Sequence, residues 1–149
     1  MYKKILVPTD GSKFAEKAEE EALFIANASG AEIIALGVVD TGFSIGVASD
    51  EAVAHIKEML KKEAEDNIGI IEKMKEKEHL DVKISLRIEE GYPAKVILDT
   101  IEKEDVDLVV MGSSGKSGLD RFIVGSVTDK VVKAVKRPIL VVYWYFDLL

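Results

Sequence analysis

The chain has 149 residues and a mass of 16.4 kDa, enough for one domain with a hydrophobic core over residues 1–149. Its net charge of −7 disfavours nucleic-acid binding, and a bound polyphosphate would need a local positive field to overcome it. The absence of cysteine excludes disulfides and thiolate metal sites. The apolar run after Lys4 is too short for a signal peptide or a membrane span, so we expect a soluble, cytoplasmic protein.

The first part of the chain predicts a strand, a helix and a second strand. Residues 4–7 form a short apolar run, and residues 12–29 have the spacing of a helix that Gly30 closes. We expect the charged residues of that helix, Glu19 among them, to lie opposite its apolar face. Residues 33–39 are almost all apolar, as in a strand that is buried on both faces of a parallel sheet.

The middle of the chain predicts a loop, one long helix and an edge strand. Residues 40–49 are rich in small side chains and predict the loop. Helical spacing of apolar residues then runs over 53–79, with Gly69 as an unexplained weak point. Residues 81–88 alternate between polar and apolar, which indicates a strand with one exposed face near the edge of a sheet.

The last part of the chain completes an alternating pattern. Pro93 is at a position that favours a helix start, residues 108–111 predict a central strand, 127–135 a helix and 138–143 a last strand. Strands that alternate with helices need right-handed crossovers. We therefore predict an α/β fold: an open five-stranded parallel sheet with four helices, which cover both faces in a Rossmann-like arrangement.

Two loops lie where such sheets bind ligands, beyond the carboxyl ends of strands: residues 8–12 and 111–118. The second contains the triplet GKS, but it is not a P-loop, because Val110 stands where that motif requires glycine. It does not have the Rossmann spacing either, since Ser114 stands where the second glycine should be.

The glycines have a different spacing: Gly112, two residues, Gly115, nine residues, then Gly125 and Ser126. With a strand before it and a helix after it, this pattern resembles the nucleotide-binding signature of the universal stress protein family. The sequences KILVPTDGS, VVD, GSVT and KRPILVV resemble other segments of that family, so the resemblance covers nearly the whole chain. It departs from the family at Ser114, where His or Arg is frequent.

The resemblance implies an adenine nucleotide alpha hydrolase-like fold that binds ATP, with or without an accompanying Mg or Mn ion. Adenine would lie between the first and fourth strand ends, against the backbone of Val38 and the side chains of Met111 and Val127. The implied nucleotide-binding set is Pro8, Thr9, Asp10, Val38, Met111, Gly112, Ser113, Gly115, Lys116, Ser117, Gly125, Ser126 and Val127.

The residues support a phosphate site independently. Gly112 and Gly115 permit positive φ and the close approach of a ligand, and free N–H groups follow Gly125 at a helix start. Ser126 could instead be an ordinary N-cap, and Asp10 an ordinary turn residue. The sequence has no motif that would supply a base to a serine nucleophile and no metal-binding spacing, so we predict no catalytic residue and no protein metal site.

The C-terminal residues 143–149 place four aromatic side chains after the last strand. Members of the family commonly dimerise by pairing that strand, so the resemblance implies a homodimer with the tail packed across it. The alternative is a tail that folds back on its own core. Three functions remain open: an ATP-binding stress or regulatory protein with an unknown protein partner, a slow or partner-stimulated ATPase or phosphotransferase, and a nucleotide-free interaction module.

Overall fold

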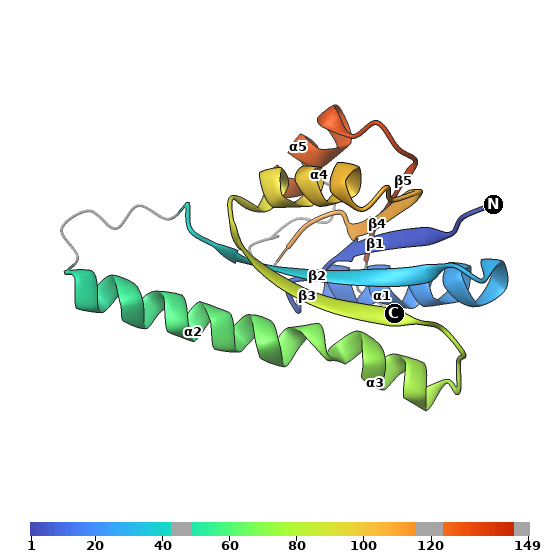
Figure 1. Ribbon diagram of the computed structural model, residues 1–149, viewed down its shortest axis with the longest axis horizontal. Helices are drawn as coiled ribbons and strands as arrows, with labels where there is room; N and C mark the ends of the chain where they lie inside the picture. Colours follow the sequence, from blue (N-terminus) through green and yellow to red (C-terminus); the bar gives the residue numbers. More distant parts are fainter. Residues whose placement is uncertain (43–48, 116–123, 145–149) are drawn as a thin grey trace, which may run out of the picture.

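The computed structural model describes residues 1–42, 49–115 and 124–144, and Figure 1 shows helices on both sides of one sheet. None of the helices in these ranges is long and apolar enough to cross a bilayer. In chain order the elements are β1 (Lys4–Pro8), α1 (Lys13–Ser29), β2 (Glu32–Asp40), α2 (Asp50–Ile68), α3 (Ile70–Lys77), β3 (Ile84–Gly91), α4 (Pro93–Lys103), β4 (Leu108–Gly112), α5 (Ser126–Ala134) and β5 (Ile139–Val142).

The described strands form one five-stranded sheet in the order β3-β2-β1-β4-β5, and every neighbouring pair is parallel. This confirms the predicted fold and the edge position of β3. Helices α1, α2 and α3 cover one face of the sheet, and α4 and α5 cover the other (Figure 1). The strand order reverses between β1 and β4, so a ligand is expected at the carboxyl ends of these strands.

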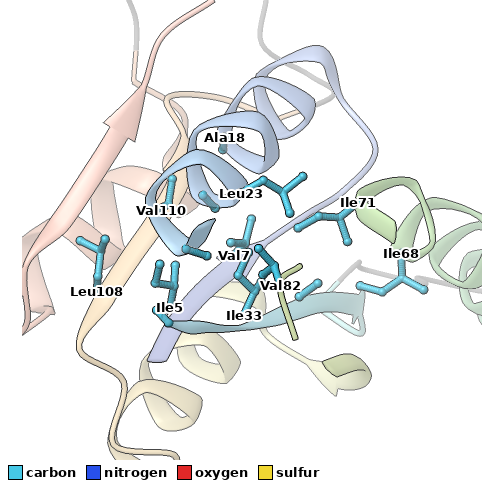
Figure 2. Close-up of a cluster of buried hydrophobic side chains, with 14 residues drawn as sticks. Ile5, Val7, Ala18, Leu23, Ile33, Ile68, Ile71, Val82, Leu108 and Val110 are labelled. Carbon is cyan, nitrogen blue, oxygen red and sulfur yellow. The ribbon is translucent and has the colours of Figure 1, made fainter. Parts of the chain in front are cut away.

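The core lies on both faces of the central strands. Ile5 and Val7 of β1 pack beneath α1, where Figure 2 shows Ala18 and Leu23 above them. Leu6, between them in sequence, points to the other face, toward α4 and α5. All three β1 side chains are fully buried, which explains why the central strands are continuous apolar runs. This packing fixes the strand ends that carry the loops.

Helix α1 begins one residue after the predicted start, with Ser12 as its N-cap, and ends at the predicted Ser29. The Ser12 hydroxyl accepts a hydrogen bond from the backbone N–H of Ala15 at 3.1 Å, which satisfies one of the free donors at the helix start. Gly30 adopts a φ of 79°, the left-handed conformation that ends helices and that glycine tolerates best.

The prediction of a single helix over 53–79 is wrong. The helical segment is divided at Gly69 into α2 and α3, so the described residues contain five helices where the sequence predicted four. Gly69 has the lowest helix propensity of any residue in this segment. The two parts also pack on different elements, α2 on β2 and β3 and α3 on α1, which favours a change of direction between them.

Strand β3 begins at Ile84 instead of Asp81 and continues to Gly91. Its partner strand accounts for this shift. The register pairs Ile33 with Ile84 and Asp40 with Gly91. Because β2 begins at Glu32, it offers little strand for residues 81–83 to pair with.

The predicted position of Glu19 on an exposed face is also wrong, because this side chain is 0% exposed. Helix α1 packs against the sheet and also against α3. Its buried stripe is therefore wider than that of a helix that packs on a sheet alone. Ala15, Glu19, Ala22 and Ala26 follow one another at helical spacing within that stripe. A carboxyl group is therefore enclosed among apolar side chains.

Candidate functional site

A pocket lies at the carboxyl ends of β1, β2 and β4, where the strand order reverses. Its volume is about 390 Å³, within the range of small-molecule sites. The wall combines apolar side chains with polar groups from the loops after β1 and β4. It consists of Pro8, Thr9, Asp10, Ala15, Leu36, Val38, Asp40, Pro93, Ile97, Met111, Gly112, Ser114, Gly115, Gly125, Ser126, Val127 and Thr128.

Most of the predicted site residues lie together in this wall: Pro8, Thr9, Asp10, Val38, Met111, Gly112, Gly115, Gly125, Ser126 and Val127. Ser113 lies behind it, with 1% of its surface exposed, and its Oγ has no hydrogen-bond partner within the described ranges. Lys116 and Ser117 lie outside the described residues.

The sequence-based set missed several wall residues, of which Asp40, Ser114, Ile97 and Thr128 are instructive. Asp40 ends the second apolar run, and Ser114 stands between two predicted glycines. Both could have been identified from their positions at the carboxyl ends of strands. Ile97 and Thr128 belong to α4 and α5, whose placement over the sheet no local pattern specifies.

The deep part of the pocket is apolar. Leu36 is 0%, Ile97 is 2% and Met111 is 4% exposed, and Val38 and Val127 extend the same surface toward the opening. These side chains come from β2, β4, α4 and α5, so they surround the space from several sides. A flat, largely apolar group such as a nucleobase is the type of ligand that this slot would bury.

Side chains hold the loop after β1 in place. The Asp10 carboxylate Oδ1 accepts from the N–H of Ser12 at 3.0 Å, and the Asn67 side-chain amide of α2 donates to the Asp10 carbonyl at 3.1 Å. Gly11 has a φ of +78°, and a Cβ there would lie 2.4 Å from the Asn67 side chain. The turn role considered for Asp10 is thus present, and the residue lines the pocket as well.

Gly112 has a packing role within the chain besides its predicted place at the nucleotide site. Neither Gly112 nor Gly115 uses the positive φ that glycine permits. Gly112 still belongs to β4, and a Cβ on it would lie 2.7 Å from the Cβ and 2.8 Å from the carbonyl carbon of Phe14. This glycine therefore lets α1 approach the end of β4.

Gly115 and Gly125 allow two other close approaches. A Cβ on Gly115 would lie 2.5 Å from Oδ2 of Asp10, so the missing side chain brings the two pocket loops together. A Cβ on Gly125 would lie 3.1 Å from the Cα of Ser114. At both positions a neighbouring residue of the chain leaves little room for a side chain, so the need for glycine does not depend on a ligand.

The N-terminus of α5 forms one rim of the pocket. Gly125, and not Ser126, is the N-cap, so the alternative of an N-cap serine is wrong. The first N–H groups of a helix have no partner within it, and Ser126, Val127 and Thr128 all line the pocket. The Thr128 hydroxyl donates to the buried carbonyl of Gly112 at 2.8 Å, which fixes this helix end against β4.

The charges of the described wall are negative. Asp10 and Asp40 line the pocket, whereas none of its described residues is a lysine or arginine. Within these ranges, the positive field for an anion comes from the N-terminus of α5. No cluster of three or more His, Asp or Glu side chains that could hold a metal occurs in the same part of the chain.

Solved structures with the same fold are similar to this chain over nearly its whole length. The universal stress protein UspA from Lactobacillus plantarum has a TM-score of 0.84 at 29% identity, with 95% of this chain and 97% of that chain covered. A universal stress protein in complex with cAMP has a TM-score of 0.60 at 24% identity, with coverages of 95% and 96%. An Arabidopsis thaliana family protein with AMP bound has 0.65 at 20%, with coverages of 94% and 90%.

The sequence comparisons agree with the fold. The model of the universal stress protein family matches residues 1–143. The chain is 40% identical over 142 residues to the universal stress protein MJ0531 of Methanocaldococcus jannaschii, which covers 95% of this chain and 82% of that protein. With its spaced glycines at the carboxyl ends of a parallel sheet and a family match along nearly its entire length, the chain belongs to the universal stress protein family.

Proposed function

We propose that this protein binds an adenine nucleotide, ATP in the first place, and acts as a nucleotide-dependent regulatory or stress-response module in the cytoplasm. The observation that carries this proposal is an apolar slot that continues directly to the N-terminus of α5. Such a pocket offers a site for a base beside a site for phosphates. The cAMP and AMP held by two proteins of the same fold support the assignment.

In the proposed complex the adenine lies in the apolar slot, against the backbone of Val38 and the side chain of Met111. Pro8, Thr9 and Asp10 line the adenosine side. The phosphates extend over Gly115 to the N–H groups that begin at Ser126. Lys116 and Ser117, which lie outside the described residues, complete the proposed set.

A Mg or Mn ion would be held mainly by the phosphates themselves. Asp10 and Asp40 are the carboxylates of the described wall, which is too few for a metal site built by the protein alone. In this proposal the binding of the nucleotide, and not its hydrolysis, is the regulatory event. The bound nucleotide changes the contacts of the pocket loops with a protein partner.

The experiment is the extraction of small molecules from the purified protein, with their identification by mass spectrometry, followed by titration calorimetry with ATP, ADP, AMP and cAMP. We expect retained adenine nucleotide or binding of ATP, with no ADP formed on incubation with magnesium. ADP that accumulates would instead identify a slow ATPase. A folded protein without retained nucleotide and without affinity for any of the four would contradict the proposal.

The chain offers a matched pair of glycine variants for this experiment. Gly115→Ala places a methyl group against Asp10 at the pocket and should weaken ATP binding by about tenfold, or ~1.4 kcal/mol. Gly69→Ala adds the same group between α2 and α3, where nothing lies within 4 Å, and should bind like the wild type. Equal loss in both variants would mean that the effect is not local to the pocket.

We also propose that the protein is a homodimer through β5. Leu140 on this edge strand is 37% exposed and Tyr143 after it is 43% exposed, and edges of this kind favour pairing. Trp144 meets Phe14 of its own α1 edge-on, at 5.9 Å between ring centroids, so the tail begins by packing on its own chain. The remaining tail residues, 145–149, lie outside the described ranges.

Sedimentation of edge variants tests the dimer. Leu140→Lys, and a chain that stops after Val142, should lower the mass toward that of a monomer. Leu86→Lys makes the same change on the opposite edge strand, where Leu86 is 39% exposed, and should leave the dimer intact. A dimer that survives both β5 changes would place the interface elsewhere.

A further inference from the structure

A carboxyl group is enclosed directly below the pocket wall. Glu19 of α1 is 0% exposed, and within the described ranges neither of its carboxyl oxygens forms a hydrogen bond of normal geometry. Buried charges in proteins are usually paired, because an ion without a partner loses its hydration without compensation. Helix formation does not require this residue, and the pocket wall does not include it, so its enclosure needs another explanation.

The surroundings of Glu19 favour the neutral acid. Burial is the main cause and raises the pKa of Glu19 from 4.5 to about 7. The Thr9 hydroxyl stabilises the ionised form and lowers the pKa, whereas the carboxylates of Glu16, Asp10 and Glu20 raise it. Among the elements packed on α1, β4 and β5 contain no charged residue, and the three carboxylates that raise the pKa of Glu19 belong to α1 itself and to the loop after β1.

Thr9 connects this carboxyl to the pocket. It lines the pocket although it is only 8% exposed, and its backbone N–H donates to the Leu36 carbonyl at 2.9 Å. Its hydroxyl oxygen accepts from the N–H of Gly11 at 3.4 Å. Thr9 is thus a wall residue of the pocket and also a neighbour of the buried Glu19 carboxyl.

We propose that Glu19 is a positioning residue of this pocket, whose proton decides whether the Thr9 hydroxyl donates its hydrogen bond to a bound nucleotide or to Glu19. This inference rests on the proposed nucleotide function. The protonated carboxyl donates its O–H to Thr9 Oγ1, so the Thr9 O–H is left to donate into the pocket. The ionised carboxylate accepts the Thr9 O–H, and Thr9 then presents only a lone pair to the ligand.

The two states differ in their affinity for an anion. A phosphate oxygen is attracted by a donated O–H and repelled by a lone pair and by the negative charge behind it. Binding of a nucleotide must therefore favour the protonated acid, so the protein takes up a proton as it binds. The affinity for the nucleotide is expected to fall as the pH rises through neutrality.

The experiment compares ATP binding in the presence of magnesium by calorimetry between about pH 6 and about pH 8, in the wild type, Glu19→Gln and Glu21→Gln. Glu21 is exposed on the same helix, so its variant is the matched control. We expect the wild type and Glu21→Gln to lose about three- to tenfold in affinity relative to Glu19→Gln, since one pKa unit of coupling is about tenfold. Any titration of the ligand itself is common to all three proteins.

A second measurement does not depend on a ligand. The backbone amide signals of Thr9 and Gly11, followed by NMR in the free protein, should titrate with a midpoint near the Glu19 pKa of about 7 in the wild type and Glu21→Gln. They should not titrate in Glu19→Gln. Thr9→Val, which keeps the shape but removes the hydroxyl, should bind ATP weakly and with little dependence on pH even if Glu19→Gln is poorly folded.

The outcomes separate the two proposals. A wild type that titrates but binds no adenine nucleotide would overturn the proposed function while leaving the link from Glu19 to Thr9. Amide titrations that persist in Glu19→Gln, or that are absent from the wild type, would overturn the inference. Identical pH profiles of ATP affinity in the wild type and Glu19→Gln would overturn it as well.

Discussion

The two loops that build the pocket keep their shape by different means. After β1, side chains from other elements act on the loop: Asn67 of α2 donates to the Asp10 carbonyl, and the buried carboxyl of Glu19 in α1 interacts with the Thr9 hydroxyl. After β4, most of the hydrogen bonds come from the backbone itself: the Ser113 N–H donates to the Val142 carbonyl at 2.9 Å, and the Gly125 N–H donates to the Ser113 carbonyl at 2.8 Å. In the proposal for Glu19 the first loop responds to a proton, whereas the second depends on the absence of side chains at its glycines.

The largest effect of this difference between the loops is expected at Glu19. Because its pKa is raised to about 7 in the folded chain, the folded protein keeps a proton that the unfolded chain releases near 4.5, and stability is lost as the pH rises between these values. The loss should reach about 3 kcal/mol by pH 8. Glu19→Gln should remove it, as measured by denaturant unfolding at about pH 5 and about pH 8.

Glu21→Gln is the control for that measurement, since the same change at an exposed site should leave the wild-type slope. Urea or guanidinium midpoints that decline equally in the wild type and in Glu19→Gln would mean that Glu19 is ionised in the folded chain across this range. The first loop would then be as insensitive to protons as the second.

The next test breaks the second loop. Gly112→Ala forces a methyl group against the backbone of Phe14, which cannot move without displacing α1, and should destabilise the protein by about 2 kcal/mol. Gly115→Ala meets only the end of the Asp10 side chain, so its stability should change by less than about 1 kcal/mol. Thermal and denaturant unfolding of both variants would measure the difference, and equal losses would refute the assigned role of Gly112.

A smaller effect is expected where a side chain contributes to the second loop. Thr128→Val keeps the volume of the side chain but leaves the buried Gly112 carbonyl without the hydroxyl that donates to it. The expected cost is about 1 to 2 kcal/mol in the free energy of unfolding. Thr128→Ser retains the hydroxyl and should recover most of that loss; if it does not, the methyl packing and not the hydrogen bond is what matters.

The smallest effect is expected at Asn67. Asn67→Ala removes an exposed hydrogen bond to the Asp10 carbonyl and should cost about 0.5 to 1 kcal/mol. Hydrogen exchange should show faster opening of the amides near Gly11, with no change around Gly125. Faster exchange in both loops would show that they are not held independently.

Much of the site could be predicted because it depends on short-range patterns. The apolar runs before Pro8 and Met111 identify central strands, and parallel strands bring their carboxyl ends together, so Asp10 and Gly115 were expected near each other. The structural roles of these residues were harder to predict from the sequence. Gly112 was predicted as a ligand contact, and no local pattern indicated that it also accommodates Phe14, a residue almost a hundred positions earlier in the chain.

The sequence by itself determined the alternation of strands and helices along the chain, the α/β class and the set of glycines at the pocket. These features depend on propensity and spacing, which act over a few residues. Tertiary structure alone decided that α1 is covered on a second side, which buries Glu19. It also decided that the helix after β2 divides at Gly69, and that Gly125, not Ser126, caps α5. The burial of a side chain and the close approach of two segments depend on which elements pack together, and no local sequence pattern specifies that packing.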